Sequence, residues 1–345
     1  FGIDLNPPQV NFLKIQERKQ KIVSTLRQGM QFRLKDIDFI ASEARFTSST
    51  SIKTSTGSID FKSALIASGS IPFELPAFKF DNKILSSDSL LELDKIPASL
   101  LIIGGGVIGC EFASLFSSLG TKVTIVEKLA NLLPTEDIDI AKKLENTFKK
   151  KGVKVLTGAD ASTINLNDFE KVLVSVGRKP FTEGLGLEEI NVKTEKGKII
   201  IDDFLKTSVE NIYAAGDCTA KIMLAHFAAY QGELAIDNIK NSNSRSANNT
   251  IVPNCIFTDP QISSVGLKEE EAKKQNIAID IKKFDFLGSG MARIIDETDG
   301  FLKLIIDKNG RLLGASIIGP GATELIATLT IAIKSGRTIK DLRST

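Results

Sequence analysis

The sequence predicts an α/β protein that contains a Rossmann-like nucleotide-binding unit and ends in a C-terminal α+β domain. One observation is a strand, glycine loop, helix and second strand within about thirty residues, from position 100 to 127. A second is the continued alternation of helix and strand up to position 176, which indicates a parallel sheet with helical cover. A third is the change after position 250, where strands are mixed with the helices expected over 268–275 and 322–334.

Composition excludes several classes of protein. The 345 residues include 44 Lys and Arg against 42 Asp and Glu, and this net charge of +2 argues against a nucleic-acid partner. The longest uncharged apolar stretch, residues 96–110, is shorter than the ~20 residues of a membrane span, so we expect no membrane segment. Three cysteines far apart in the sequence and a single histidine favour no disulfide framework and no metal site. We therefore expect an intracellular, cytoplasmic protein.

The segments before the glycine loop are predicted from spacing and turn residues. Apolar residues at three- and four-residue intervals predict a long amphipathic helix over 7–35. Residues 38–70 indicate short strands, the last of which is apolar and runs into a tight loop. Residues 72–97 are rich in Pro, Ser and Asp, as in a crossing between domains.

The segments after the loop follow from the same signals. We expect helices over 138–151 and 224–240, strands over 122–127, 153–156, 172–176, 199–201 and 212–215, and a polar linker over 241–250.

The glycine loop is the strongest chemical signal. It runs through Gly104, Gly105, Gly106, Val107, Ile108 and Gly109, between a strand and an apolar helix face. The first glycine of the G-x-G-x-x-G pattern permits a sharp turn, the second lets a pyrophosphate approach the backbone, and the third lets helix and strand pack closely. The free N–H groups at the helix start then bind the anion. The alternative is a glycine turn that packs helix on strand without a ligand.

Glu127 ends the second strand of the unit. A carboxylate there accepts hydrogen bonds from an adenosine ribose and repels a 2′-phosphate, so we expect NAD rather than NADP. Lys128, the next residue, opposes this preference because it adds a positive charge.

Other polar residues have competing interpretations. Asp217 follows a buried strand, where its carboxylate holds cofactor hydroxyls or caps its own turn. His226 is interpreted as a packed, hydrogen-bonded residue in preference to a general base, because no acid or thiol neighbours it in sequence. The cysteines Cys110, Cys218 and Cys255 are expected to be small core residues.

Five segments, taken in order, resemble one family. They are residues 67–72, 104–111, 176–180, 215–217 and 257–261, with the sequences ASGSIP, GGGVIGCE, VGRKP, AGD and FTDPQ. Together they resemble the FAD-dependent pyridine nucleotide-disulfide oxidoreductases over nearly the whole chain. Residues 223–226, 264–267 and 322–333 look most like the dihydrolipoamide dehydrogenase branch of that family.

The resemblance implies a domain division and two cofactors, FAD and NAD. It implies an incomplete Rossmann-like FAD domain over 1–85 and 181–249, an inserted NAD domain over 86–180, and a dimerisation domain over 250–345 that makes a homodimer. It places Ser68, Gly69, Ser70, Asp217, Met223, Leu224, Ala225 and His226 along the flavin, with Asp217 on the ribityl hydroxyls. It places Gly177 and Glu111 near the nicotinamide, although a first-turn carboxylate such as Glu111 is also favoured by the helix dipole alone.

The departures from the family pattern concern its catalytic groups. The sequence has no first glycine loop for FAD, no two cysteines separated by four residues and no terminal His-x-x-Pro segment, and residues 159–171 are shorter than the corresponding β-meander. Because the chain starts at Phe1 and stops at Thr345, we expect a fragment. The missing glycine loop predicts poor FAD affinity, and the missing thiols and base predict no lipoamide turnover by the chain as printed.

The resemblance implies that the parent enzyme oxidises protein-bound dihydrolipoamide with NAD⁺ through FAD and a redox disulfide. Its partners would be the lipoyl-bearing domains of 2-oxo acid dehydrogenase or glycine cleavage complexes. The alternatives are another disulfide or mercuric reductase of the family, or a non-catalytic NAD-binding dimeric module.

Overall fold

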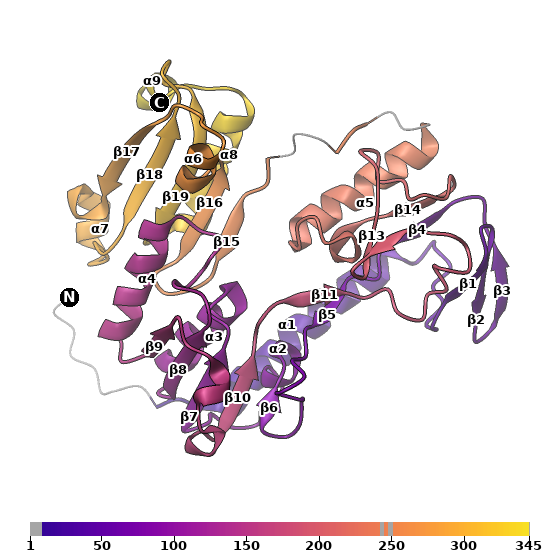
Figure 1. Cartoon of the computed structure of the whole chain (residues 1–345), viewed down its shortest axis with the longest axis horizontal. Helices are drawn as coiled ribbons and strands as arrows, with labels where there is room; N and C mark the ends of the chain where they lie inside the picture. Colours follow the sequence, from indigo (N-terminus) through magenta and orange to yellow (C-terminus); the bar gives the residue numbers. More distant parts are fainter. Residues whose placement is uncertain (1–8, 242–244, 248–250, 345) are drawn as a thin grey trace.

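The computed structural model describes residues 9–241, 245–247 and 251–344. Parts of the predicted first helix, of the predicted linker and the last residue lie outside this range. Figure 1 shows a parallel sheet beside a C-terminal antiparallel sheet, and a third group of elements joined to them by a narrow two-stranded connection.

A five-stranded parallel sheet carries the predicted nucleotide-binding unit. Its order is β6 (Ile84–Leu85), β10 (Lys171–Val174), β7 (Ser99–Ile103), β8 (Lys122–Glu127) and β9 (Lys154–Thr157). The central strand β7 is a continuous apolar run whose Leu100, Leu101 and Ile102 are all buried, as expected for a parallel strand covered on both faces. The predicted strand over 122–127 is confirmed without a shift.

The two faces of this sheet are covered differently. Helices α3 (Val107–Ser118) and α4 (Ile138–Lys150) pack on one face in a shared hydrophobic cluster. The other face is packed by residues 75–80 and by the segment after β9, which forms only the short 3₁₀ helices η1 (Ala161–Thr163) and η2 (Leu166–Asp168). The expected helical cover is therefore correct for one face of the sheet. It is wrong for the other face, because the short segment between β9 and β10 forms only these two 3₁₀ turns and no α-helix.

The C-terminal sheet is antiparallel, which confirms the predicted α+β character. Its order is β15 (Asn254–Ile256), β16 (Ile262–Gly266), β19 (Leu312–Ile318), β18 (Phe301–Ile306) and β17 (Asp280–Asp285). The helical pieces are α6 (Glu269–Lys274), η4 (Phe286–Gly288), α7 (Gly290–Ile294), α8 (Ala322–Lys334) and α9 (Ile339–Arg343). Phe301 and Ile318 of this sheet belong to the same buried cluster as Leu100 and Phe148, so the two sheets share a core.

The third group of elements holds the residues predicted for the flavin. Strand β4 (Ala64–Ile66) pairs in parallel with β14 (Ile212–Ala214), which leads into η3 (Gly216–Thr219) and α5 (Ala225–Lys240). Beside them lie the meander β1 (Arg45–Ser48), β2 (Ser51–Thr54) and β3 (Gly57–Asp60) and the hairpin β12 (Thr194–Glu195) and β13 (Lys198–Ile199). The antiparallel pair β5 (Ser70–Pro72) and β11 (Arg178–Pro180), with the short α2 (Ser87–Leu90) nearby, connects this group to the parallel sheet (Figure 1).

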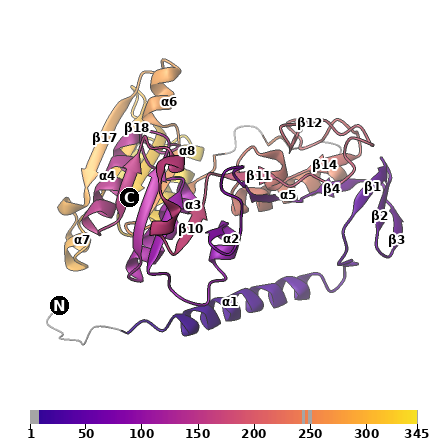
Figure 2. The same ribbon diagram turned by 60° about the horizontal axis from the view of Figure 1, so that its bottom comes forward.

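Helix α1 (Phe12–Arg33) lies along the outside of the molecule. Asn11 caps it, because its side-chain oxygen accepts a hydrogen bond from Lys14 N at 3.1 Å. The helix begins at Phe12 and ends at Arg33, so it is shorter than the range 7–35 predicted from the apolar spacing. No residue of α1 is buried. Gln16 Nε2 donates to Leu93 O at 2.5 Å and Lys19 Nζ to Leu91 O at 2.6 Å, so polar contacts attach the helix to the body (Figure 2).

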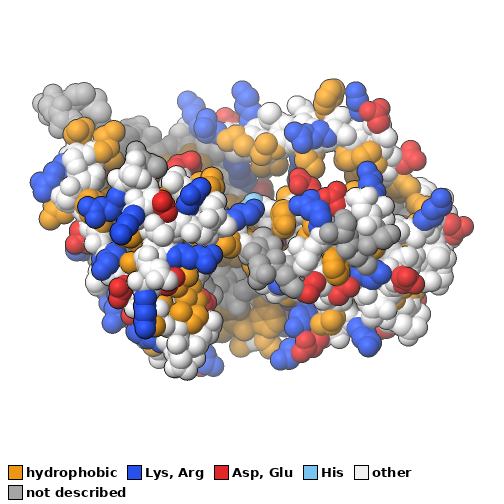
Figure 3. Space-filling model, turned by 90° about the horizontal axis from the view of Figure 1, so that it is seen from above, with side chains coloured by type: hydrophobic (Ala, Val, Ile, Leu, Met, Phe, Trp, Pro, Cys, Tyr) orange, Lys and Arg blue, Asp and Glu red, His pale blue; other side chains and the backbone are white. Residues whose placement is uncertain are grey.

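Surface charge is mixed, as the near-zero net charge indicates. Lys and Arg side chains alternate with Asp and Glu over the face seen in Figure 3. Among the residues that the structure describes, no helix combines the length and apolar composition that a membrane crossing requires.

A buried ion cluster fastens the parallel sheet to the C-terminal sheet. Lys303 of β18 is only 3% exposed, and its Nζ lies 2.7 Å from Glu269 Oε2, 3.3 Å from Asp137 Oδ2 and 3.3 Å from Asp139 Oδ1. Burial by itself lowers the pKa of Lys303, but these carboxylates more than compensate and raise it above its usual value. Asp137 also accepts from Ser316 Oγ at 3.0 Å, so the start of α4 is held directly on β19.

Replacing Lys303 tests the contribution of this cluster. We expect Lys303→Met to lower the free energy of unfolding by about 3 kcal/mol, because it leaves the buried Asp137 carboxylate and two partly buried carboxylates without their cation. Urea unfolding followed by circular dichroism measures the change. Lys282→Met on the neighbouring strand β17, where the side chain is exposed, is the matched control and should behave like the unmodified protein. Equal stability of the two variants would show that the cluster does not fasten the sheets.

Candidate functional site

The glycine loop joins β7 to α3, and at two of the three glycines of the pattern there is no space for a side chain. A Cβ atom on Gly109 would lie 2.0 Å from Gly104 O, and one on Gly104 would lie 2.5 Å from Ser175 O. Gly104 also has a φ of +108°, which side-chain-bearing residues rarely adopt. These two glycines are therefore required by the packing of helix, strand and loop.

Gly106 is different, because a Cβ there would meet nothing within 4 Å. It is the N-cap residue of α3 and has no side chain to cap the first N–H groups of that helix. Neither packing nor a positive φ requires glycine at this position. An open backbone at a helix start suits the close approach of an anion, so the loop fits a dinucleotide pyrophosphate.

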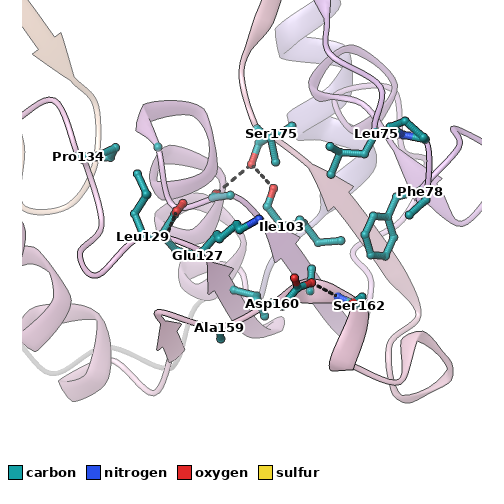
Figure 4. Close-up of a pocket in the computed structure, with 18 residues that line it drawn as sticks. Leu75, Phe78, Ile103, Glu127, Leu129, Pro134, Ala159, Asp160, Ser162 and Ser175 are labelled. Atoms are coloured by element: carbon teal, nitrogen blue, oxygen red, sulfur yellow. Dashed lines mark hydrogen bonds between the residues drawn. The ribbon is translucent and has the colours of Figure 1, made fainter.

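A cavity of about 620 Å³ opens beside this loop at the carboxyl ends of the parallel strands. Its wall is mostly apolar and combines the ends of β7 and β8 with residues after β9 and β10 (Figure 4). The labelled lining residues in Figure 4 are Leu75, Phe78, Ile103, Glu127, Leu129, Pro134, Ala159, Asp160, Ser162 and Ser175. A cavity at this edge of a parallel sheet is where nucleotides bind in doubly wound folds.

Glu127 stands at the end of β8 and is nearly buried, with 8% exposed. Its Oε2 accepts a hydrogen bond from Gly105 N at 2.6 Å, and its Oε1 accepts from Leu129 N at 2.7 Å. The carboxylate thus holds the glycine loop as well as facing the cavity. Each oxygen keeps a further lone pair, so the contact with a ribose hydroxyl stays compatible with this geometry and remains a prediction.

Glu111 lies on α3 but does not line the cavity. Its Oε1 accepts from Phe257 N at 2.9 Å, in the segment after β15. Burial raises the pKa of this carboxyl, and the hydrogen bond from Phe257 offsets part of the increase. The predicted contact of Glu111 with a nicotinamide carboxamide stays untested, and the structure gives this residue a link to the C-terminal sheet.

Two segments predicted for the flavin meet in space. Ser70 Oγ donates to Asp217 Oδ2 at 2.6 Å across 147 positions of sequence. Ser68 Oγ donates to Phe181 O at 2.5 Å, and Gly69 between them has a φ of +72°. The Asp217 side chain is thus engaged with Ser70, and the hydrogen bond within its own turn runs from Ala220 N to the Asp217 carbonyl.

Sequence reasoning assigned no role to Arg178, although it lies in one of the five family segments. Its Nε donates to Ser70 Oγ and its Nη2 donates to Ser70 O, both at 2.8 Å. Its Nη1 lies 3.6 Å from Asp88 Oδ1 in α2. The sequence did contain a signal for Arg178, because this charged residue follows a glycine in a strand that joins two units. Arg178 orients Ser70, which in turn holds Asp217.

Gln231 of α5 is a second residue that sequence reasoning missed. It is fully buried, and its Oε1 accepts from Gly216 N at 2.8 Å, directly before Asp217. Its Nε2 has no hydrogen-bond partner among the described residues. The amide therefore fixes the backbone that carries Asp217.

The remaining predicted residues lie at the start of α5 and after β10. Met223 precedes the helix, Leu224 is its N-cap, and Ala225 and His226 open it. His226 is exposed, and its Nε2 lies 3.0 Å from Pro253 O, so the expectation of a packed histidine is wrong because the ring faces solvent, while the expected hydrogen bond is present. Gly177 has a φ of +122° and follows Ser175 and Val176 of the cavity wall.

The cysteines are far from a redox arrangement. Cys110 and Cys218 are buried, as predicted, and Cys255 is partly buried. Burial is the main reason that the pKa of each of the three thiols is raised. A raised pKa disfavours the reactive thiolate form. The described part of the chain also contains no group of three or more His, Cys, Asp or Glu side chains placed to hold a metal ion.

The fold and the cavity define a nucleotide-binding protein, and comparison with known families identifies which one. Residues 5–232 match the model of the pyridine nucleotide-disulphide oxidoreductases, and residues 252–345 match the dimerisation domain of the same family. The chain belongs to the pyridine nucleotide-disulphide oxidoreductase family.

Similar proteins indicate which members of this family the chain resembles. The chain is 38% identical to a dihydrolipoyl dehydrogenase of Geobacillus stearothermophilus over 100% of its own length and 78% of the relative's. It is 36% identical to that of Chlamydia pneumoniae, with 98% and 78% covered. Among solved structures it is similar to the HOCl-induced flavoprotein disulfide reductase RclA of Escherichia coli, with a TM-score of 0.90, 28% identity and 97% and 82% covered. LpdA of Mycobacterium tuberculosis gives a TM-score of 0.90 at 26% identity, with 98% and 80% covered.

These relatives confirm the predicted fold class, the cofactors FAD and NAD, and the class of NAD-dependent oxidoreductase. The dimerisation domain supports the expected homodimer. The roles of the individual site residues and the domain boundaries remain predictions.

Substitutions at two pattern glycines separate ligand binding from packing. We expect Gly106→Ala to leave the unfolding temperature unchanged and to weaken NADH binding at least tenfold, because its methyl group occupies open space at the helix start. Isothermal titration with NADH and differential scanning calorimetry measure the two effects.

Gly109→Ala is the contrasting variant, since its methyl group meets the Gly104 carbonyl, and it should lower the unfolding temperature. Gly29→Ala in α1, which also has open space, controls for the effect of an added methyl on NADH affinity, which it should leave unchanged. Its own unfolding temperature should rise slightly, because Ala is a better helix former than Gly. Unchanged NADH affinity in Gly106→Ala would contradict a pyrophosphate at this loop.

Proposed function

We propose that this chain serves in the oxidation of protein-bound dihydrolipoamide with NAD⁺, through FAD and a redox disulfide. The observation that carries the proposal is the open backbone at Gly106 beside a cavity that ends at Glu127, in a chain 38% identical along its whole length to a dihydrolipoyl dehydrogenase. An alternative within the family is a disulfide or mercuric reductase.

The NAD would lie along the carboxyl ends of β7, β8 and β10. The N–H groups after Gly106 would bind the pyrophosphate, and Glu127 would accept hydrogen bonds from the adenosine ribose. Gly177 follows the cavity residue Val176 and would contact the nicotinamide half. Glu111, which reaches Phe257 here, would turn toward the carboxamide.

The flavin would lie along Ser68 to Ser70 and the start of α5, with Asp217 accepting hydrogen bonds from its ribityl hydroxyls. Arg178 and Ser70 support this role, because they orient the Asp217 carboxylate through two short hydrogen bonds. Residues 223–226 would follow the ring edge. When bound, the flavin and nicotinamide would supply the two-electron chemistry, while the protein would orient them.

The thiols and partners form the remaining part of the proposal. Electron transfer from dihydrolipoamide requires a pair of exchanging thiols, and no two of the three cysteines in the printed sequence are separated by four residues. The partners would be lipoyl-bearing domains of 2-oxo acid dehydrogenase or glycine cleavage complexes. Three free thiols favour a reducing, cytoplasmic setting.

The coding DNA on both sides of this sequence provides the test. We expect the whole reading frame to supply a Cys-x-x-x-x-Cys upstream and a His-x-x-Pro downstream, and the expressed protein to reduce NAD⁺ with dihydrolipoamide, measured at 340 nm. The chain as printed, assayed in parallel, should bind NADH without turnover.

Glutathione disulfide and mercuric ion with NADPH serve as competing substrates in the same assay. Activity on one of these and none on dihydrolipoamide would assign the protein to a sister reductase. Start and stop codons at the present ends, together with NADH binding, would favour a non-catalytic module.

A further inference from the structure

The segment after β9 brings a second carboxylate to the nucleotide cavity. Asp160 and Glu127 line the cavity (Figure 4), and Lys128 is a further lining residue. Lys128 is the residue whose charge opposes the preference for NAD, because an ammonium group beside the adenosine ribose attracts a 2′-phosphate. The balance of these three charges therefore bears on which dinucleotide the cavity accepts.

Backbone hydrogen bonds fix the position of Asp160 relative to the end of β8. Gly158 N donates to Leu129 O at 2.8 Å, and Ala159 N donates to Glu127 O at 3.0 Å. These bonds tie the residues after β9 to those after β8, beyond the last paired residues Glu127 and Thr157. Lys128 lies between the two acceptor residues, and Asp160 directly follows the second donor residue, Ala159.

The Asp160 side chain is also held in place. Its Oδ1 accepts from Ser162 N at 2.9 Å, which caps η1 (Figure 4). The hydrogen bonds from Ser162 lower the pKa of this carboxyl, and the nearby charge of Lys128 adds to the effect. Asp160 is therefore a fixed negative charge at neutral pH, on the same cavity wall as Lys128.

We propose that Asp160 neutralises Lys128 and so acts beside Glu127 as a second determinant of the preference for NAD over NADP. This inference rests on the proposed binding of NAD in the cavity. Glu127 repels the 2′-phosphate directly, whereas Asp160 removes the cation that would otherwise hold it. The short segment 159–171 makes this arrangement possible, because it turns into η1 immediately after Asp160 and keeps the carboxylate at the cavity.

A double-mutant cycle with binding readouts tests the proposal without requiring turnover. NADH and NADPH are titrated into the unmodified chain, Asp160→Asn, Lys128→Gln and the double variant at low ionic strength. We expect Asp160→Asn to tighten NADPH binding about two- to fivefold and to leave NADH binding unchanged, the range typical of an interaction between exposed charges. The gain should vanish in the double variant and at high salt.

Asp168→Asn is the matched control, since Asp168 lies on the same segment, is exposed and does not line the cavity. It should bind both dinucleotides like the unmodified chain. A gain in NADPH affinity that persists without Lys128, or equal changes for NADH and NADPH, would overturn the neutralising role of Asp160. Absence of NADH binding by the unmodified chain would instead contradict the proposed function.

Discussion

The close contact between the start of α3 and the end of β7 determines the geometry of the whole nucleotide-binding unit. Gly109 allows the helix to lie against the Gly104 carbonyl, where any Cβ would clash. Ser175 completes the contact from the next strand, because its hydroxyl donates to Gly104 O at 3.1 Å and to Ile103 O at 3.2 Å. The carboxyl ends of β10, β7 and β8 therefore meet at the helix start, and the residues that follow these strands become the cavity wall.

Only a short stretch of chain separates the cavity wall from the residues predicted for the flavin. Val176 lines the cavity, Gly177 follows with a positive φ, and Arg178 holds Ser70. The two cofactor regions are thus coupled through a very short stretch of backbone. On its other side the parallel sheet shares a buried core and the Lys303 ion cluster with the C-terminal sheet. The parallel sheet therefore has a broad, buried attachment to the C-terminal sheet and a narrow, partly exposed connection to the residues predicted for the flavin.

Features with a local cause were predicted well from the sequence. The strand over 122–127 and the helix over 322–334 have their predicted bounds, because apolar periodicity and glycine stops are local signals. Contacts between distant segments were not predictable in this way. The bonds between Arg178 and Ser70 span 108 positions, and no residue of α1 is buried despite the apolar spacing of that helix. The hydrogen bond between His226 Nε2 and Pro253 O likewise joins two segments, 27 positions apart.

Glu127 both lines the cavity and accepts hydrogen bonds from the backbone around it, and this limits which substitutions there could change the nucleotide preference. Its carboxylate satisfies the buried N–H of Gly105 and the N–H of Leu129, so a neutral amide at this position would leave one donor without an acceptor. An unpaired buried N–H costs about 1–3 kcal/mol, and one of the two donors, Gly105, belongs to the glycine loop. The predicted contact of Glu127 with a ribose would therefore be coupled to the geometry of this loop. Residues at the exposed rim have no such duty toward the loop, so the specificity of the cavity is more readily adjusted at the rim than at Glu127 itself.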